Sequence, residues 1–166
     1  MVPLMQLIPR SLIKNLDKLF FDADILRKEI SELRACRQAD ANNSADPTGR
    51  EAVATVAPVE WWKGYHHPEQ WLQVVDNTWA RYGDTYIGRA MRDRYMSGNN
   101  SLQIATGNYI SRETYFKWKE TFLICALLEA AKLRVCIQDM IDKEYQSHGI
   151  KGWEGNNKWN PEQQDG

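Results

Sequence analysis

The segment that decides the fold is residues 101–118, SLQIATGNYISRETYFKW, which has the pattern of a helix-turn-helix. A small residue, Ala105, stands where the first helix must approach the second closely. Ser111 is a typical N-cap, and Tyr115 and Trp118 follow it at helical spacing, so both aromatic rings would face the first helix. The segment therefore predicts two helices that pack on each other around a tight turn.

The polar side chains of the second helix are left to point outward. Hydroxyls and cations near the N-terminus, with apolar residues behind them, are the composition of a recognition helix that enters the major groove of DNA. These outward residues are Arg112, Glu113, Thr114, Lys117 and Lys119. We expect the cations to neutralise phosphates and Thr114 and Arg112 to contact base edges.

The charge around this segment supports a local DNA contact. The whole chain has a formal net charge of -1, so it is not a general polyanion binder. Residues 81–120 carry seven basic and four acidic side chains, a local excess of +3. Arg89, Arg92 and Arg94 lie on the helix expected just before the motif, where phosphate contacts are common. A solvated helix face is the alternative interpretation.

Composition bounds the remaining possibilities. A chain of 166 residues is sufficient for one compact domain, or for a small domain with a helical extension. Its three cysteines are widely separated and favour reduced thiols in the cytoplasm over a disulfide framework. The apolar run at the N-terminus is too short to span a membrane. We therefore expect a cytoplasmic protein with no membrane partner.

The N-terminal section, residues 1–39, is expected to be a long helix. Its apolar residues alternate in spacings of four and three, which is a heptad seam. The seam consists of Leu12, Leu16, Leu19, Ala23, Leu26, Ile30 and Leu33. Two interpretations remain open. In the first, the seam contacts another chain, either as a homodimeric coiled coil or by docking on a partner. In the second, it packs on the protein's own C-terminal helices.

The rest of the chain is expected to be helical as well. Residues 40–58 have the composition of a linker, and residues 59–148 are predicted to form a helical DNA-binding domain with the motif near 101–120. Within it we expect a helix from Pro68 to Tyr82, one capped by Asp84, and a long one from Ser111 towards Ile141. No segment shows the alternation of a strand. The prediction is an all-α fold, a long N-terminal helix plus a helical bundle, with a disordered tail at residues 149–166.

Catalytic and metal chemistry find little support. His66 and His67 are adjacent and point to different faces, and Glu69 offers a single further ligand. The chain has no phosphate-cradling glycine loop and no nucleophile elbow. We expect no enzyme activity, no catalytic residue, no metal and no cofactor.

Several segments resemble the phage-encoded transcriptional regulators of the ArpU and RinA type. The likeness covers roughly residues 12–133, and residues 110–118 are its most specific part. The segments that carry it are LDKLFFDADILRKEISELR at 16–34, DPTGREA at 46–52, YIGRAMRDRYMSG at 86–98 and ISRETYFKWKETFLICAL at 110–127. The turn at residues 106–109 departs from the usual helix-turn-helix pattern.

The resemblance implies a sigma-factor region 4-like helix-turn-helix. It implies a sequence-specific DNA-binding regulator of late phage genes that recognises promoter DNA and acts with host RNA polymerase. The residues that match the recognition helix are Ser111, Arg112, Thr114, Tyr115, Lys117 and Lys119. Two alternatives stay open: a small terminase-like DNA-packaging protein, and a helical protein-interaction module without DNA binding.

Overall fold

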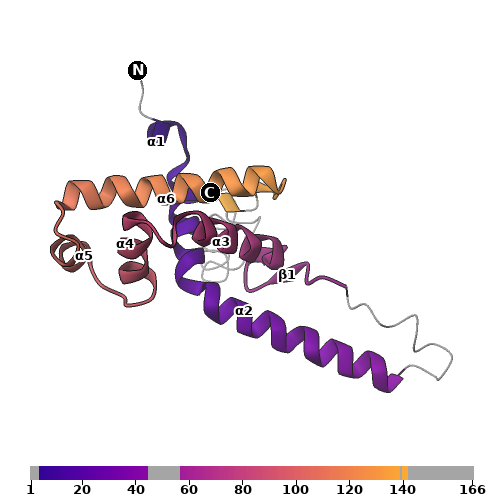
Figure 1. Cartoon of the computed structure of the whole chain (residues 1–166). Helices are drawn as coiled ribbons and strands as arrows, with labels where there is room; N and C mark the ends of the chain where they lie inside the picture. The colour runs from indigo at the N-terminus through magenta and orange to yellow at the C-terminus, as the bar shows by residue number, and fades with distance from the viewer. Residues whose placement is uncertain (1–3, 45–56, 139, 142–166) are drawn as a thin grey trace, which may run out of the picture.

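The computed structural model describes residues 4–44, 57–138 and 140–141, and it is all-α apart from one short hairpin (Figure 1). The helices are α1 (Leu4–Leu7), α2 (Arg10–Ser44), α3 (Pro68–Tyr82), α4 (Tyr86–Tyr95), α5 (Ser101–Gly107) and α6 (Arg112–Lys132). The hairpin strands are β1 (Trp61–Trp62) and β2 (Tyr65–His66). The predicted fold class, all-α with a long N-terminal helix and a helical bundle, is confirmed.

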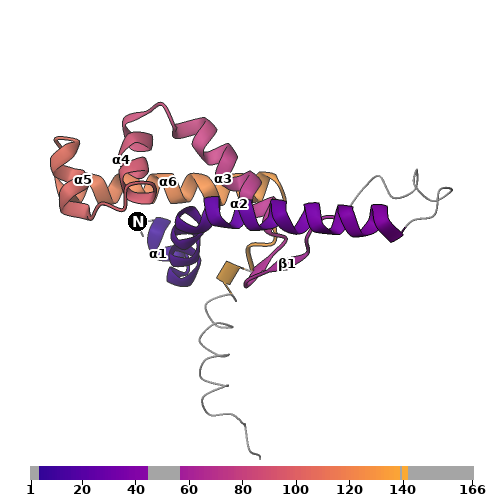
Figure 2. The same ribbon diagram turned by 90° about the horizontal axis from the view of Figure 1, so that it is seen from below.

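The heptad seam of α2 packs on the protein's own helices. Leu12, Leu16, Leu19, Ala23, Leu26 and Ile30 are all buried, and α2 contacts α3 and α6. Of the two interpretations of the seam, the structure shows the intramolecular one, and a homodimer through the same side chains would have to displace this core. The C-terminal end of α2 projects beyond the bundle (Figures 1 and 2). It ends at Ser44, so the first residues of the predicted linker 40–58 are helical, whereas residues 45–56 lie outside the described part.

The core lies where α2, α3, α4 and α6 meet. Phe122 of α6 is fully buried, with its ring centroid 4.9 Å from that of Phe20 and 4.9 Å from that of Trp79. Tyr95 stacks on Phe20 at 5.3 Å. Each ring comes from a different helix, and aromatic pairs at these separations add to the free energy gained by burying their area. This cluster fixes α4 and α6 against the long N-terminal helix.

The hairpin was not predicted from the sequence. Trp61 pairs with His66 and Trp62 with Tyr65 around a two-residue turn. Lys63 and Gly64 both take positive φ, at 47° and 85°, as a type I′ turn requires. Strands of two residues are too short to show alternation. The Lys63-Gly64 dipeptide between aromatic residues was the available signal.

Two helix boundaries differ from the prediction. The helix from Pro68 to Tyr82 is confirmed, but Thr85 rather than Asp84 caps α4, because its Oγ1 accepts from the Gly88 amide at 3.1 Å. The long last helix stops at Lys132, and Arg134 takes a positive φ of 54°. Residues 149–166 lie outside the described part of the chain.

A further helical turn follows α6 and packs back on α2. The carbonyl oxygen of Met140 accepts a hydrogen bond of 2.5 Å from Asn15 Nδ2, and both residues are buried. The predicted continuous helix towards Ile141 is therefore interrupted. Among the helices in the described ranges, none combines the length and apolarity that crossing a bilayer demands.

Candidate nucleic-acid interface

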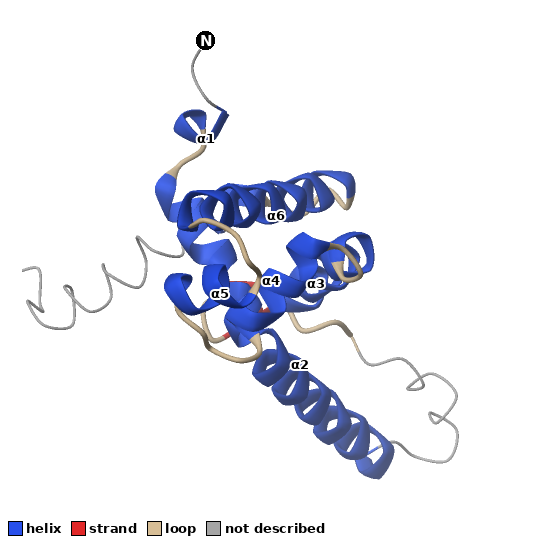
Figure 3. Cartoon of the chain, turned by 60° about the vertical axis from the view of Figure 1, so that its left-hand side comes forward, coloured by secondary structure: helices blue, strands red, loops and turns tan. Residues whose placement is uncertain are grey.

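The candidate interface is built on α5 and α6, which form the two helices of the predicted motif. Each helix begins with a side-chain cap. Asn100 Oδ1 accepts from the Gln103 amide at 2.9 Å, and Ser111 Oγ accepts from the Thr114 amide at 3.0 Å. Ala105 is buried at 3% exposure, as expected for the close approach of the two helices. Because α4, α5 and α6 all contact one another, the motif stands on a three-helix framework (Figure 3).

The turn between α5 and α6 has a tyrosine in the left-handed conformation, which asparagine adopts more readily. Tyr109, not Asn108, takes the left-handed conformation, with φ of 56° against -102°. Asn108 instead donates through Nδ2 to Asp93 at 3.0 Å and to the Ile104 carbonyl at 2.8 Å, which ties the turn to α4. Tyr109 is 96% exposed, whereas Ile110 packs partly against the core.

The first half of α6 presents an outward stripe of four exposed residues: Arg112, Glu113, Phe116 and Lys117. We call these four residues the recognition stripe. Lys117 forms an ion pair with Glu113 at 3.3 Å, and Arg112 Nη2 donates to Ser101 Oγ at 3.3 Å. Exposed ion pairs of this kind are weak and exchange readily for other partners. Phe116 was not among the predicted DNA contacts, although its spacing of four residues from Arg112 places both on one face.

Tyr115 and Arg94, two predicted DNA-binding residues, belong to the interior instead. Tyr115 is fully buried, and its hydroxyl accepts from Arg94 Nη1 at 3.0 Å. Arg94 also donates to both carboxylate oxygens of Asp17 on α2. Neither side chain is presented to a ligand, because packing and the buried carboxylate hold them. This corrects the prediction that both residues contact DNA, whereas the predicted inward packing of the Tyr115 ring is confirmed.

Lys119 also lies outside the exposed recognition stripe, at an edge of α6 that packs near Asp17. Its ammonium lies 3.9 Å from Asp17 Oδ2, and its side chain is 24% exposed. Burial lowers the pKa of Lys119, although the nearby Asp17 carboxylate acts in the opposite direction. Two residues along a helix differ by about 200° in direction, which is why Lys117 and Lys119 meet different surroundings.

The remaining predicted DNA-binding residues lie at or near the surface, as a contact with DNA requires. Arg89 and Arg92 are exposed on α4, with the Arg89 guanidinium 5.6 Å from the Tyr86 ring centroid. Ser111 is exposed and its hydroxyl caps α6, whereas Thr114 is half-buried and its hydroxyl accepts from Ser111 Oγ at 3.0 Å. The accessible cations of the predicted set are therefore Arg89, Arg92, Arg112 and Lys117.

Residues considered for metal chemistry do not converge. Glu69 accepts from Arg34 Nη1 and from the Val59 amide, so its carboxylate is already occupied. Throughout the described residues, no group of three His, Cys, Asp or Glu side chains is placed to hold a metal ion.

Comparison with protein-family models, curated proteins and solved structures finds no match for this chain. The function must therefore be inferred from the geometry of α4, α5 and α6.

Proposed function

We propose that the protein is a sequence-specific DNA-binding transcriptional regulator of late phage genes, which recognises promoter DNA through α5 and α6. The observation that carries the proposal is the two-sided start of α6. Its first two turns expose the recognition stripe on one side and bury Tyr115 on the other, and Phe122, Leu123 and Ala126 further along are fully buried. A helix that is packed on one side and exposed on the other near its capped N-terminus is how helix-turn-helix proteins present side chains to the major groove.

The recognition stripe has the residue types for contacts with DNA phosphates and for contacts with base edges. Lys117 can exchange Glu113 for a DNA phosphate at little cost, since the pair is exposed. Arg112 is long enough to reach a guanine edge, and Phe116 can contact a thymine methyl group. Arg89 and Arg92 on α4 supply further cations for phosphates. The stripe carries a net charge of only +1, which favours modest non-specific affinity and a larger share of base contacts.

The resemblance to ArpU- and RinA-type regulators adds host RNA polymerase as a proposed partner. Fluorescence anisotropy with phage intergenic DNA and with scrambled DNA, each across a salt series, tests the proposal. Selective binding to the intergenic DNA with a steep salt dependence supports a regulator. Equal, weak binding to both sequences contradicts sequence-specific recognition, and no binding at low salt contradicts the proposal altogether.

A protein-interaction module is the second candidate, and exposed apolar side chains favour it. Ile25, Met96 and Leu102 are each more than 60% exposed, and Tyr109 is 96% exposed. Single exposed apolar residues are common on protein surfaces, so they carry less weight than the recognition stripe. Retention on an RNA polymerase column without any shift of DNA would favour this candidate.

A further inference from the structure

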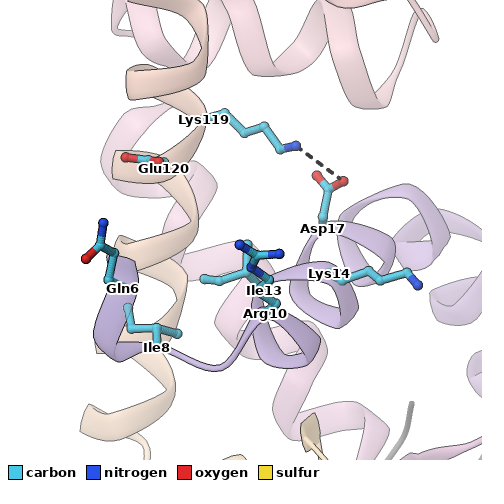
Figure 4. Close-up of a pocket in the computed structure, with 8 residues that line it drawn as sticks. All are labelled: Gln6, Ile8, Arg10, Ile13, Lys14, Asp17, Lys119 and Glu120. Atoms are coloured by element: carbon cyan, nitrogen blue, oxygen red, sulfur yellow. Dashed lines mark ion pairs between the residues drawn. The ribbon is translucent and has the colours of Figure 1, made fainter. Parts of the chain in front are cut away.

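A pocket of about 660 Å³ lies between the start of α2 and the middle of α6 (Figure 4). Arg10, Ile13 and Asp17 line it from α2, and Lys119 and Glu120 line it from α6. Its volume is within the range of small-molecule sites in proteins. The N-terminal helix and the helix that carries the recognition stripe therefore both contribute side chains to this pocket.

The Lys119 ammonium is poorly compensated in this pocket. Its contact with Asp17 is 3.9 Å, which is too long for a hydrogen bond. The carboxylate oxygens of Asp17 already accept two hydrogen bonds from Arg94 and one of 2.6 Å from the Tyr95 hydroxyl. A half-buried cation without a close acceptor among the described residues is desolvated with little compensation, and an anion in the pocket would supply that acceptor.

The charges around the pocket favour an anion. Arg10, Lys14 and Lys119 are the cations that line it, and Asp17 and Glu120 are the anions. Asp17 is neutralised by its two-pronged pair with Arg94. In Figure 4 the Lys119 side chain extends from α6 towards Asp17, whereas the Glu120 carboxylate lies away from that contact and the Lys14 ammonium points away from both. Because Asp17 is paired with Arg94, Arg10 and Lys119 outweigh the remaining carboxylate of Glu120 in the pocket.

We propose that Arg10 and Lys119 bind a phosphate group in this pocket, and that DNA supplies it from its backbone. The inference rests on the proposed DNA-binding function. Lys119 is seven residues beyond Arg112, which is about 10 Å along the helix and nearly two full turns, so the two side chains leave α6 in about the same direction. A duplex placed on the recognition stripe would therefore extend towards the pocket. The N-terminal helix, which carries none of the predicted DNA-binding residues, would then contribute Arg10 to the DNA interface.

The test compares the wild-type protein with Arg10→Gln, Lys119→Gln and the double variant. Lys18→Gln is the matched control, because Lys18 is an exposed α2 lysine, 61% accessible, outside the pocket. DNA affinity is measured by anisotropy between about 50 and 200 mM salt. Two lost phosphate contacts should reduce the salt slope by about two, so that the fold-change in Kd over this range becomes about tenfold smaller. The control should keep the wild-type slope.

Pyrophosphate titrations by calorimetry on the same proteins distinguish the sources of the phosphate. A reduced DNA slope in the double variant supports a backbone phosphate. Pyrophosphate binding that the variants lose, in a protein that binds no DNA, supports the pocket as a site for a free phosphate compound but overturns the proposed function. A folded double variant that keeps the wild-type salt slope for DNA and the wild-type pyrophosphate affinity contradicts the proposed phosphate site in the pocket. Arg10→Gln changes an exposed position, so it still tests the pocket if the loss of Lys119 disturbs folding.

Discussion

Arg94 on α4 and Asp17 on α2 form a two-pronged ion pair, with Nε and Nη2 of the guanidinium donating to the two carboxylate oxygens at 3.0 and 2.5 Å. The side chains are only 18% and 17% exposed. Arg94 also donates to the Tyr115 hydroxyl of α6, and the Tyr95 hydroxyl donates to Asp17. One carboxylate on the N-terminal helix therefore holds both α4 and the start of α6 in place.

Asp17→Asn is expected to destabilise the protein by about 3 kcal/mol. Removing one charge of a buried pair leaves the other uncompensated, and the remaining solvent contact puts the cost at the lower end of the usual range. The matched control is Asp76→Asn, which breaks the bidentate pair with Arg27, where both side chains are 46% exposed. That change should cost less than about 1 kcal/mol. If urea unfolding gives equal losses in the free energy of unfolding for the two variants, the Asp17 pair contributes no more than an exposed ion pair, which would contradict the prediction.

Gly88→Ala and Gly107→Ala are expected to have opposite effects. A Cβ at Gly88 would collide with the backbone carbonyl of Tyr82, which cannot move cheaply, so a loss of about 1–3 kcal/mol follows. A Cβ at Gly107, in α5, meets nothing within 4 Å. Alanine there should be neutral or stabilise by up to about 1 kcal/mol, since it reduces the freedom of the unfolded chain. Thermal unfolding of both variants is the measurement, and a shift of the same sign in both would refute this interpretation.

Local signals in the sequence predicted the elements well. Pro68 marks the start of α3, Ser111 caps α6, and the periodicity of α2 identifies the side chains that are buried. Periodicity does not say whether an apolar seam meets its own chain or a second copy, because both bury the same side chains. Only the contacts of α2 with α3 and α6 answer that question.

The candidate site was harder to predict, because it depends on contacts between distant residues. Arg94 and Asp17 lie 77 positions apart, and nothing near either residue indicates the other. Lys117 and Lys119 both look like exposed cations of a recognition helix, yet only Lys117 is at the open surface, at 71% exposure. Propensity favours Asn108 as the left-handed residue of the turn. The hydrogen bonds from its side chain to Asp93 and Ile104 leave that conformation to Tyr109.

Tyr115→Phe should separate a structural role from a DNA contact. The ring is fully buried and its hydroxyl accepts from Arg94, so the loss of this oxygen should cost about 1–2 kcal/mol of stability. DNA affinity of the folded variant should stay within about twofold of wild type. A variant with unchanged stability and weakened DNA binding would return Tyr115 to the interface.

Stability should fall as the pH rises above about 10, the usual pKa of tyrosine. Burial raises the pKa of Tyr65 and of Tyr95, and the Asp17 carboxylate adds to the effect at Tyr95 as Asp22 does at Tyr65. Above about pH 10 the unfolded state releases these protons while the folded state keeps them, so alkali favours unfolding. Urea unfolding of wild type and Tyr65→Phe between about pH 8 and 11 measures the effect. The variant should show the shallower decline, and identical slopes would argue against it.

Lys117→Glu should weaken DNA binding regardless of sequence and reduce the salt slope by about one counterion, because Lys117 is assigned to a phosphate. Glu113→Gln offers the complementary change. It removes the exposed ion-pair partner of Lys117 at 3.3 Å and one negative charge, so it should tighten binding. Lys28→Glu, at an exposed α2 position whose side chain is 77% accessible, reverses the same charge away from the recognition stripe and should leave the slope unchanged. Anisotropy titrations across a salt series compare the three variants. A slope that stays at the wild-type value in Lys117→Glu would remove Lys117 from the phosphate contacts and leave Arg112 as the accessible cation of the recognition stripe.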